Sequence, residues 1–250
     1  MKRSRIILLL IFLCHASLLF SRAGGGGGDG SSSSSSSGYN SNRYYNDYHN
    51  SYNDGSLSGI IFILFVFGAI ALLIYFSYRN SIKTRKRKES SVILEAASLQ
   101  DAMWNEAKLT ELCRKIFMDM QYAWSIGSLR SVTDKITEKL YNDYTIALND
   151  MNSRGEKNII RNISIDTIEI IGAEDYISND KDSFYAYIAG SLLDYTTRGD
   201  DIIKNQEKTR ENFKDIYHFV RHENTWKLDL IINEPGIFDF QRARNTFEKK

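Results

Sequence analysis

The chain has 250 residues, 32 Lys and Arg, 31 Asp and Glu, and a formal net charge of +1 at pH 7. From Glu89 onward it carries 21 Lys and Arg against 28 Asp and Glu, a net charge of −7, whereas residues 79–88 contain six cations and no acid. An acidic domain lacks the basic face that displaces counterions from phosphates, so we do not expect nucleic-acid binding.

The first 23 residues have the layout of a secretory signal peptide. Lys2, Arg3 and Arg5 precede an apolar stretch from Ile6 to Phe20, and small residues lead up to a cleavage site after Ala23. Fifteen apolar residues are few for a membrane span, which favours cleavage, although an uncleaved first helix remains the alternative. Either way, residues 24–58 are expected outside the membrane and residues 79–250 inside.

Residues 24–58 are of low complexity. A glycine run from Gly24 to Gly28 and a serine run from Ser31 to Ser37 precede a tract rich in Asn and Tyr. Such runs behave as flexible coil, and the tract has almost no aliphatic residues with which to build a core. We predict a disordered segment that is either an inert spacer or an adhesive tail.

Residues 59–78 form an uninterrupted apolar run of 20 residues. As a helix this run is about 30 Å long, which matches the hydrocarbon core of a bilayer. Cations next to a span stay on the cytoplasmic side, so we expect a single-pass protein of the cell (plasma) membrane with its C-terminal part in the cytoplasm.

Residues 79–89 are predicted to be a basic juxtamembrane linker. Cations near a membrane surface attract anionic lipid headgroups, at about 1 kcal/mol each, although a signal that only fixes topology would look the same. The candidate headgroup-binding residues are Arg79, Lys83, Arg85, Lys86, Arg87 and Lys88.

Residues 90–240 are predicted to form the folded domain, followed by a tail over 241–250. Apolar residues recur every three or four positions from Leu109 to Trp124, which indicates one face of a helix. Gly127 is a candidate C-cap and Ser128 the next N-cap. Thr137 is a candidate N-cap for a further helix that ends before Gly155.

The period then changes from 3.6 to 2. Alternation over 163–171, 183–197, 213–221 and 226–232 indicates four strands, with a tight turn at Glu223-Asn224. Helices followed by consecutive strands predict an α+β fold, with helices packed into a curved four-stranded antiparallel sheet. Cys113 lies among apolar residues and is interpreted as core, and the histidines form no cluster, so no metal or cofactor site is expected.

Several motifs resemble those of the Tim44-like domain family. Residues 120–130 read Met-Gln-Tyr-Ala-Trp-Ser-Ile-Gly-Ser-Leu-Arg and residues 136–141 read Ile-Thr-Glu-Lys-Leu-Tyr. Leu-Leu-Asp-Tyr at 192–195, the Phe213-to-Arg221 strand and Trp226-Lys227-Leu228 complete the set. The resemblance covers roughly 109–232. It departs from the family pattern at Ser128, Glu138 and Tyr217, substitutions that preserve packing.

The resemblance implies a cone of the nuclear-transport-factor-two type with a hydrophobic cavity, and a docking role at a membrane. The candidate cavity walls are Trp124, Tyr141, Phe184, Tyr195 and Trp226. We therefore expect a non-enzymatic interaction module that acts in protein translocation or membrane-protein biogenesis, with anionic lipid and an unidentified protein as partners. A small-ligand or lipid sensor is the alternative. An isomerase or dehydratase that uses Asp194, Tyr195, Asp215 or His218 is less favoured, because no motif supports catalysis.

Overall fold

The computed structural model describes residues 55–205 and 207–249. The predicted signal peptide and nearly all of the low-complexity segment lie outside these residues. The chain divides into two units: residues 29–80 belong to one, and residues 81–250 to the other. Each is described by itself, and the second is called the domain from here on.

The first described helix, α2 (Gly55–Ser98), contains the predicted span. Its part from Ile61 is long and apolar enough to cross a membrane, and its most apolar window has a mean hydropathy of 2.5 and no buried residue. The helix also runs through residues 79–89, where we predicted a linker. The segment is helical, and from Ser81 onward it belongs to the second compact unit.

Three short helical segments and two longer helices precede or interrupt the sheet. They are η1 (Ala102–Trp104), α3 (Glu106–Ser125), η2 (Arg130–Val132), α4 (Glu138–Ser153) and, between two strands, η3 (Asn179–Lys181). Asn105 caps α3 by accepting a hydrogen bond from the Lys108 amide, and Thr137 caps α4 in the same way from Leu140, as predicted.

The end of α3 explains the glycine at 127. Gly127 has φ of +71°, the Gly127 amide donates to the Trp124 carbonyl, and the Ser128 amide donates to the Ala123 carbonyl. These two bonds form a Schellman motif, which favours glycine at the left-handed position. Ser128 therefore closes α3 and does not cap the next helix as predicted, since η2 follows Leu129, which makes no side-chain cap bond.

The sheet has six strands rather than the predicted four. They are β1 (Glu156–Asp175), β2 (Ser183–Arg198), β3 (Asp201–Lys204), β4 (Arg210–His222), β5 (Thr225–Asn233) and β6 (Asn245–Phe247), in the order β5-β4-β2-β1-β6 with β3 paired to β2. The four predicted strands are present and antiparallel, but β6 pairs in parallel with β1, so the sheet is mixed. Strands β3 and β6 and the helix α5 (Ile237–Arg242) were missed because three to six residues are too few to reveal a period.

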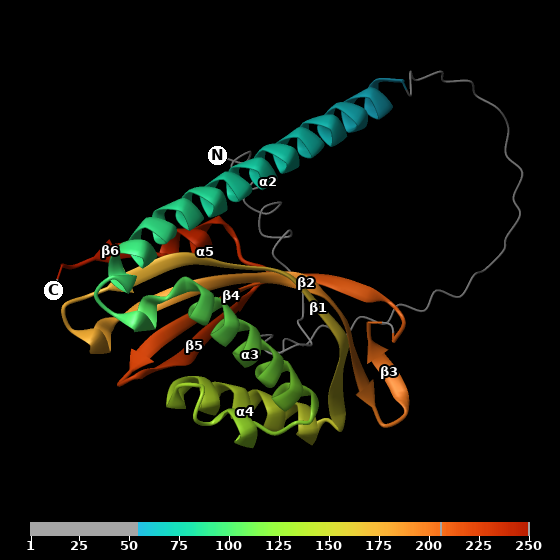
Figure 1. Cartoon of the computed structure of the whole chain (residues 1–250). Helices are drawn as coiled ribbons and strands as arrows, with labels where there is room; N and C mark the ends of the chain where they lie inside the picture. The colour runs from blue at the N-terminus through green and yellow to red at the C-terminus, as the bar shows by residue number, and fades with distance from the viewer. Residues whose placement is uncertain (1–54, 206, 250) are drawn as a thin grey trace, which may run out of the picture. The chain divides into compact units, whose positions relative to one another are not determined.

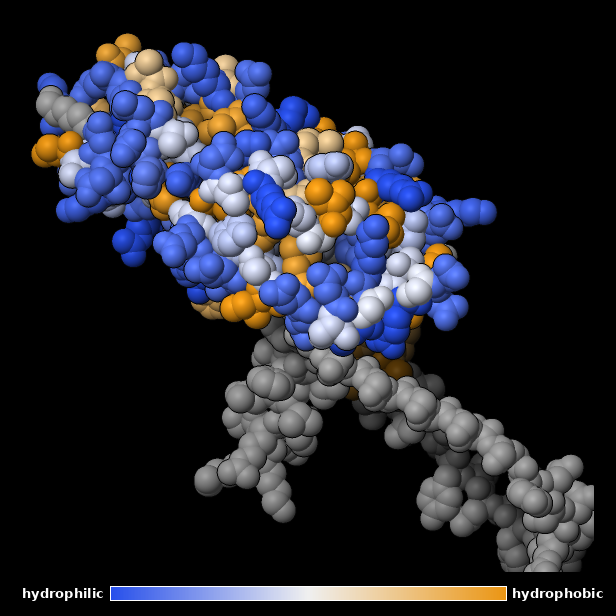
Figure 2. All heavy atoms as spheres, turned by 90° about the horizontal axis from the view of Figure 1, so that it is seen from below, coloured by the Kyte–Doolittle hydropathy of each residue, from blue (hydrophilic) through white to orange (hydrophobic). Residues whose placement is uncertain are grey.

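Helices cover both faces of this curled sheet (Figure 1). On the inner face, α3 and α4 pack against the strands in the main hydrophobic core, where Phe117 stacks on Phe213 at 5.1 Å. On the outer face, Ile82 of α2 and Phe240 of α5 join a second cluster with Ile171, Tyr187 and Ile216. The view from below Figure 1 mixes hydrophilic side chains with separate apolar patches (Figure 2).

The curl depends on a glycine in β2. Strand β1 changes register with β2 at three places, between Arg161 and Ser164, Ile165 and Thr167, and Ile170 and Gly172. Gly190 lies opposite this irregular stretch, and a Cβ atom there would stand 2.0 Å from the Ser164 carbonyl oxygen. Bulges bend a strand, and only glycine permits this close backbone approach.

Candidate functional site

The basic segment of α2 packs onto the domain through two of its cations. Lys83 lies 2.6 Å from the Glu169 carboxylate and its ammonium sits over the Tyr187 ring, 4.8 Å from the centroid. Arg87 forms an ion pair with Glu106. Beside them, the Ser90 hydroxyl donates to the Ile170 carbonyl at 2.5 Å. These contacts attach the helix to β1 and β2 and to the start of α3.

The other predicted headgroup-binding cations differ in exposure. Arg85 and Lys86 lie near Glu89 at 3.6 and 3.9 Å, with Arg85 65 % exposed and Lys86 only 14 %. Lys88 is exposed. Arg79 belongs to the other unit, where its guanidinium lies 5.3 Å from the Phe76 ring centroid. Lipid binding by this set remains a prediction, and Arg85 and Lys88 are the cations of the domain best placed for it.

The five predicted cavity walls do not share one space. Phe184 and Trp226 meet edge to face at 4.9 Å, within an aromatic cluster that includes Trp104 and Phe219. Trp124 instead packs edge to face on Tyr144 of α4. Tyr195 is buried in β2, and Tyr141 is partly buried against the inner core. Trp226 alone of the five lines the pocket described next.

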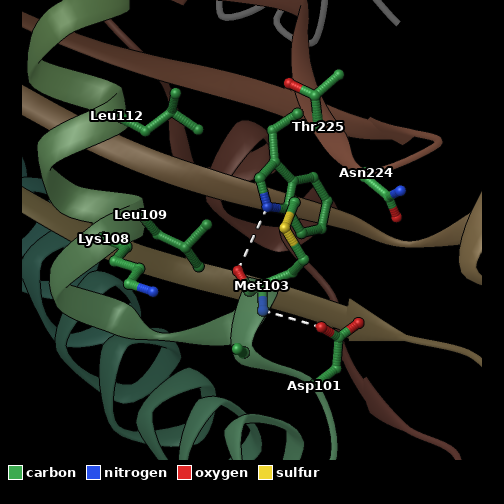
Figure 3. A pocket seen from close by; sticks show the side chains of 9 residues that line it. Asp101, Met103, Lys108, Leu109, Leu112, Asn224 and Thr225 are labelled. Carbon is green, nitrogen blue, oxygen red and sulfur yellow. Dashed lines mark hydrogen bonds between the residues drawn. The ribbon is translucent and has the colours of Figure 1, made fainter.

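An apolar pocket of about 310 Å³ opens where η1, the start of α3 and the β4–β5 turn meet (Figure 3). The side chains of Met103, Leu109, Leu112 and Trp226 supply its apolar lining, and Asp101, Lys108, Asn224 and Thr225 are its polar members. The Trp226 indole nitrogen donates to the Met103 carbonyl at 3.4 Å, so its donor is used within the protein. The pocket therefore suits a bulky apolar group rather than a hydrogen-bonding one.

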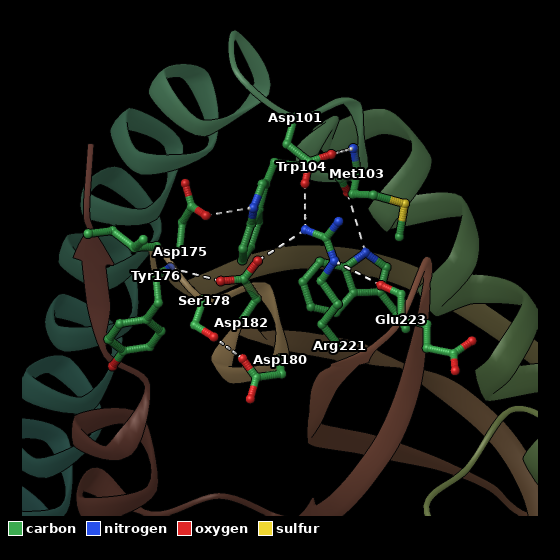
Figure 4. Close-up of polar contacts among 12 residues, drawn as sticks. Asp101, Met103, Trp104, Asp175, Tyr176, Ser178, Asp180, Asp182, Arg221 and Glu223 are labelled. Carbon is green, nitrogen blue, oxygen red and sulfur yellow. Dashed lines mark hydrogen bonds and ion pairs between the residues drawn. The ribbon is translucent and has the colours of Figure 1, made fainter. Parts of the chain in front are cut away.

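A buried ionic cluster includes Asp101, one of the residues that line this pocket (Figure 4). The Arg221 guanidinium, 4 % exposed, lies 2.5 Å from the Asp101 carboxylate and 3.0 Å from that of Asp182, whose side chain is fully buried. Arg221 also donates to the Glu223 carbonyl, and Asp182 accepts from the Tyr176 amide. The cluster thus joins η1 to the turn after β4 and to the β1–β2 connection, which fixes both sides of the pocket.

Lys108 is the charged residue at the pocket that this cluster does not use. It is exposed in the first turn of α3, and no carboxylate lies within ion-pair distance of it among the described residues. A cation in the first turn of a helix is unfavourable, because the N-terminal end of the helix dipole is positive. The pocket is therefore bordered by a cation that an acidic group from outside would stabilise.

The residues considered for catalysis are not brought together. The Asp194 carboxylate accepts a hydrogen bond from the Asn158 side-chain Nδ2 at 2.7 Å, and the Asp215 carboxylate accepts one from the Asn233 Nδ2 at 2.9 Å. Asp215 and His218 are three residues apart in β4, so their side chains lie on opposite faces of the sheet. Tyr195 is buried beside Asp194.

His218 belongs to a packed group on the outer face. Its ring stacks on Tyr185 with centroids 4.3 Å apart, and its Nδ1 lies 3.6 Å from the Asp229 carboxylate. Burial lowers the pKa of His218 against the opposing effect of Asp229. Burial also raises the pKa of the Cys113 thiol, as expected for a core cysteine. No group of three or more metal-ligating side chains occurs among the described residues.

Sequence reasoning singled out Trp226 but missed the polar residues and Met103 that complete the pocket. The segment 99–105 carried no periodic signal, so Asp101 and Met103 received no role. Asp101 is the N-cap of η1, accepting from the Met103 amide at 2.9 Å, and an Asp before an apolar pair is the signal that could have marked it. No sequence pattern marked Lys108 or Asp182 either, because their roles depend on contacts that only the fold brings about.

Comparisons with known proteins agree with the sequence motifs. A family model described as the Tim44-like domain matches residues 90–233. No curated protein matches the chain. Among solved structures, the intermembrane space region of the chloroplast protein ARC6 is 8 % identical, with a TM-score of 0.37, over 50 % of this chain and 95 % of that one, a likeness too low to support an argument. Because the family model covers more than half of the chain, this protein belongs to the Tim44-like domain family.

Proposed function

We propose that this protein is a single-pass membrane-anchored interaction module whose Tim44-like domain docks other proteins at the membrane surface. The observation that carries the proposal is the combination, in one chain, of an apolar helix long enough to span a bilayer and a Tim44-like domain. Fold alone does not fix function, so the docking role rests on this pairing and on the pocket that the domain offers.

The orientation and process are part of the same proposal. Six cations directly after the apolar run favour a cytoplasmic domain, and the cell membrane is the expected location. Protein translocation or membrane-protein biogenesis is the proposed process. Both require a soluble domain held at the membrane surface, where tethering raises its effective concentration for membrane-bound partners.

Site-specific photo-crosslinking in native membranes tests the docking role. A photoreactive residue at Thr225, on the pocket rim, should form protein adducts, whereas the same residue at Ile146 on α4, 68 % exposed, serves as the matched control. Enrichment of translocation or insertion components at Thr225 over Ile146 supports the proposed process. Equal adduct patterns at the two positions would remove the pocket as a docking surface.

The size of the pocket favours a second candidate function. Small-molecule sites usually have volumes of roughly 300–1,000 Å³, and this pocket lies at the lower end of that range. A small-ligand or lipid sensor would show displacement of protein adducts at Thr225 when extracted membrane lipids or metabolites are added. A docking module would retain them.

A further inference from the structure

Phe238 is presented to solvent on a fixed helix. It is 79 % exposed, and among the described large apolar side chains of the domain only Leu99 is more exposed. Phe240, two residues later, is 2 % exposed in the outer-face cluster and holds α5 against the sheet. The Gly236 amide donates to the Asp239 carboxylate at 2.8 Å, which fixes the start of the helix. Phe238 is thus a preorganised apolar group, which lowers the entropy lost when it binds a surface.

The chemistry of this segment matches that of the pocket. The pocket offers apolar walls and, at its edge, the Lys108 cation, which has no ion-pair partner among the described residues. Phe238 offers a large aromatic ring, and Asp239 follows it directly. One oxygen of the Asp239 carboxylate accepts from the Gly236 amide, and the other, Oδ1, lies 3.9 Å from Arg242 in a long ion pair. An aromatic ring in the pocket with an acid beside Lys108 would satisfy both features.

Phe238 cannot fill the pocket of its own chain. The pocket includes Thr225 and Trp226 at the start of β5, whereas α5 follows the end of that strand at Asn233. Nine strand residues separate the two ends by roughly 25–30 Å. An occupant from this chain must therefore belong to another copy.

We propose that the pocket binds Phe238 of a second copy of this chain, so that neighbouring copies associate head to tail on the membrane. The inference names one partner of the proposed interaction module and rests on that proposal. Because Phe238 and the pocket belong to different surfaces of the domain, the contact is heterologous, and it either closes into a ring or continues as a row of copies. Confinement to one membrane favours such a contact without a large interface.

Disulfide trapping between full-length chains in liposomes tests the contact. Chains carrying Thr225→Cys are mixed with chains carrying Phe238→Cys, in a background where Cys14 is replaced by Ser and Cys113 remains buried. We expect the mixed dimer to form at least tenfold faster than when Ile177→Cys takes the place of Phe238→Cys. Ile177 is the matched control because it is 67 % exposed and lies in the loop after β1. Equal rates for the two pairs would overturn the proposal.

Copy number provides the second measurement. Single-molecule photobleaching of wild-type chains in liposomes should reveal clusters, and Phe238→Ser should reduce them to single copies while the circular dichroism spectrum stays unchanged. Wild-type chains that are already single would overturn the proposal, as would quenching of a fluorophore at position 238 by brominated lipid, which would place Phe238 in the bilayer. Protein adducts at Thr225 combined with single copies would reject self-association and leave the docking function intact.

Discussion

Removal of the Arg221 guanidinium should destabilise the domain by about 3–5 kcal/mol, the range measured when one partner of a buried ion pair is deleted. The change Arg221→Met keeps much of the apolar stem but removes the cation that pairs with the fully buried Asp182 carboxylate. Asp101 is 20 % exposed, so water can replace Arg221 as its partner, and Asp101 adds little to the loss of stability. The measurement is urea unfolding of the full chain in micelles, followed by tryptophan fluorescence, since Trp226 and Trp104 adjoin the cluster.

Two further variants separate the charge from the packing. Asp182→Asn removes the buried charge and leaves Arg221 paired with Asp101, so combining it with Arg221→Met should recover part of the loss. Arg210→Met, at an exposed arginine whose guanidinium bonds to Ser191, should lower the free energy of unfolding by less than about 0.5 kcal/mol. A loss below about 1 kcal/mol for Arg221→Met would show that Asp182 is solvated, and the reasoning about a rigid pocket base would be wrong.

Four other expectations follow from the fold. In the same unfolding assay, Gly190→Ala should lower the free energy of unfolding by at least about 1–3 kcal/mol, because the new Cβ would meet the Ser164 carbonyl oxygen. Gly199→Ala should lower it by about 1 kcal/mol, because its Cβ has open space but its φ is +59°. Trp124→Ala should cost about 3–5 kcal/mol as a buried aromatic, and a loss under about 1 kcal/mol would place Trp124 on a binding surface. The double variant Arg85→Gln, Lys88→Gln should have lower hydrogen-exchange protection of residues 81–90 than the wild type in anionic nanodiscs but not in neutral ones, and the difference should fade as salt rises. Equal protection of the wild-type chain in both kinds of nanodisc would refute headgroup binding. Folding lowers the pKa of His218, so the stability that its neutral form contributes is fully present above pH 6.5 and is lost as pH falls through the lower folded pKa. His218→Gln should therefore flatten the decline in the unfolding midpoint between about pH 7 and 5. An unchanged slope would contradict the assignment.

The elements with a clear period could be predicted from sequence. The stripe from Leu109 to Trp124, the cap at Thr137 and the four alternating strands all occur, because each of these segments is long enough for its two faces to differ in residue type and burial. The tight turn at Glu223-Asn224 occurs as well, with Glu223 at φ of +56°. The four predicted strands carry most of the sheet, while the short β3 and β6 attach to its margins.

The pocket could not be predicted because it depends on long-range contacts. Arg221 and Asp101 are 120 positions apart, and Trp226 meets Met103 across a similar separation. Each of these residues has an ordinary local explanation as a strand end, a cap or a core aromatic. The predicted cavity walls were chosen for aromatic character alone, and aromatic side chains in a sheet pack on one another, as Phe184 does on Phe219 at 4.6 Å, before they line open space.

The basic segment shows how the same residues can satisfy two readings of a sequence. A run of cations after an apolar helix sets topology whatever the domain does, because that rule depends on charge and position. Helical geometry then divides the run by direction: Ile82, Lys83, Lys86 and Arg87 turn toward the domain and are buried or partly buried, while Arg85 and Lys88 remain exposed. Lys83 pairs with Glu169 of β1 and Arg87 pairs with Glu106 of α3. Part of the negative charge that follows residue 88 therefore attaches the helix to the domain. We expect lipid attraction to come from the exposed cations Arg85 and Lys88. A variant that replaced all six cations together would confound membrane binding with the stability of the domain, because Lys83 and Arg87 hold the helix in place.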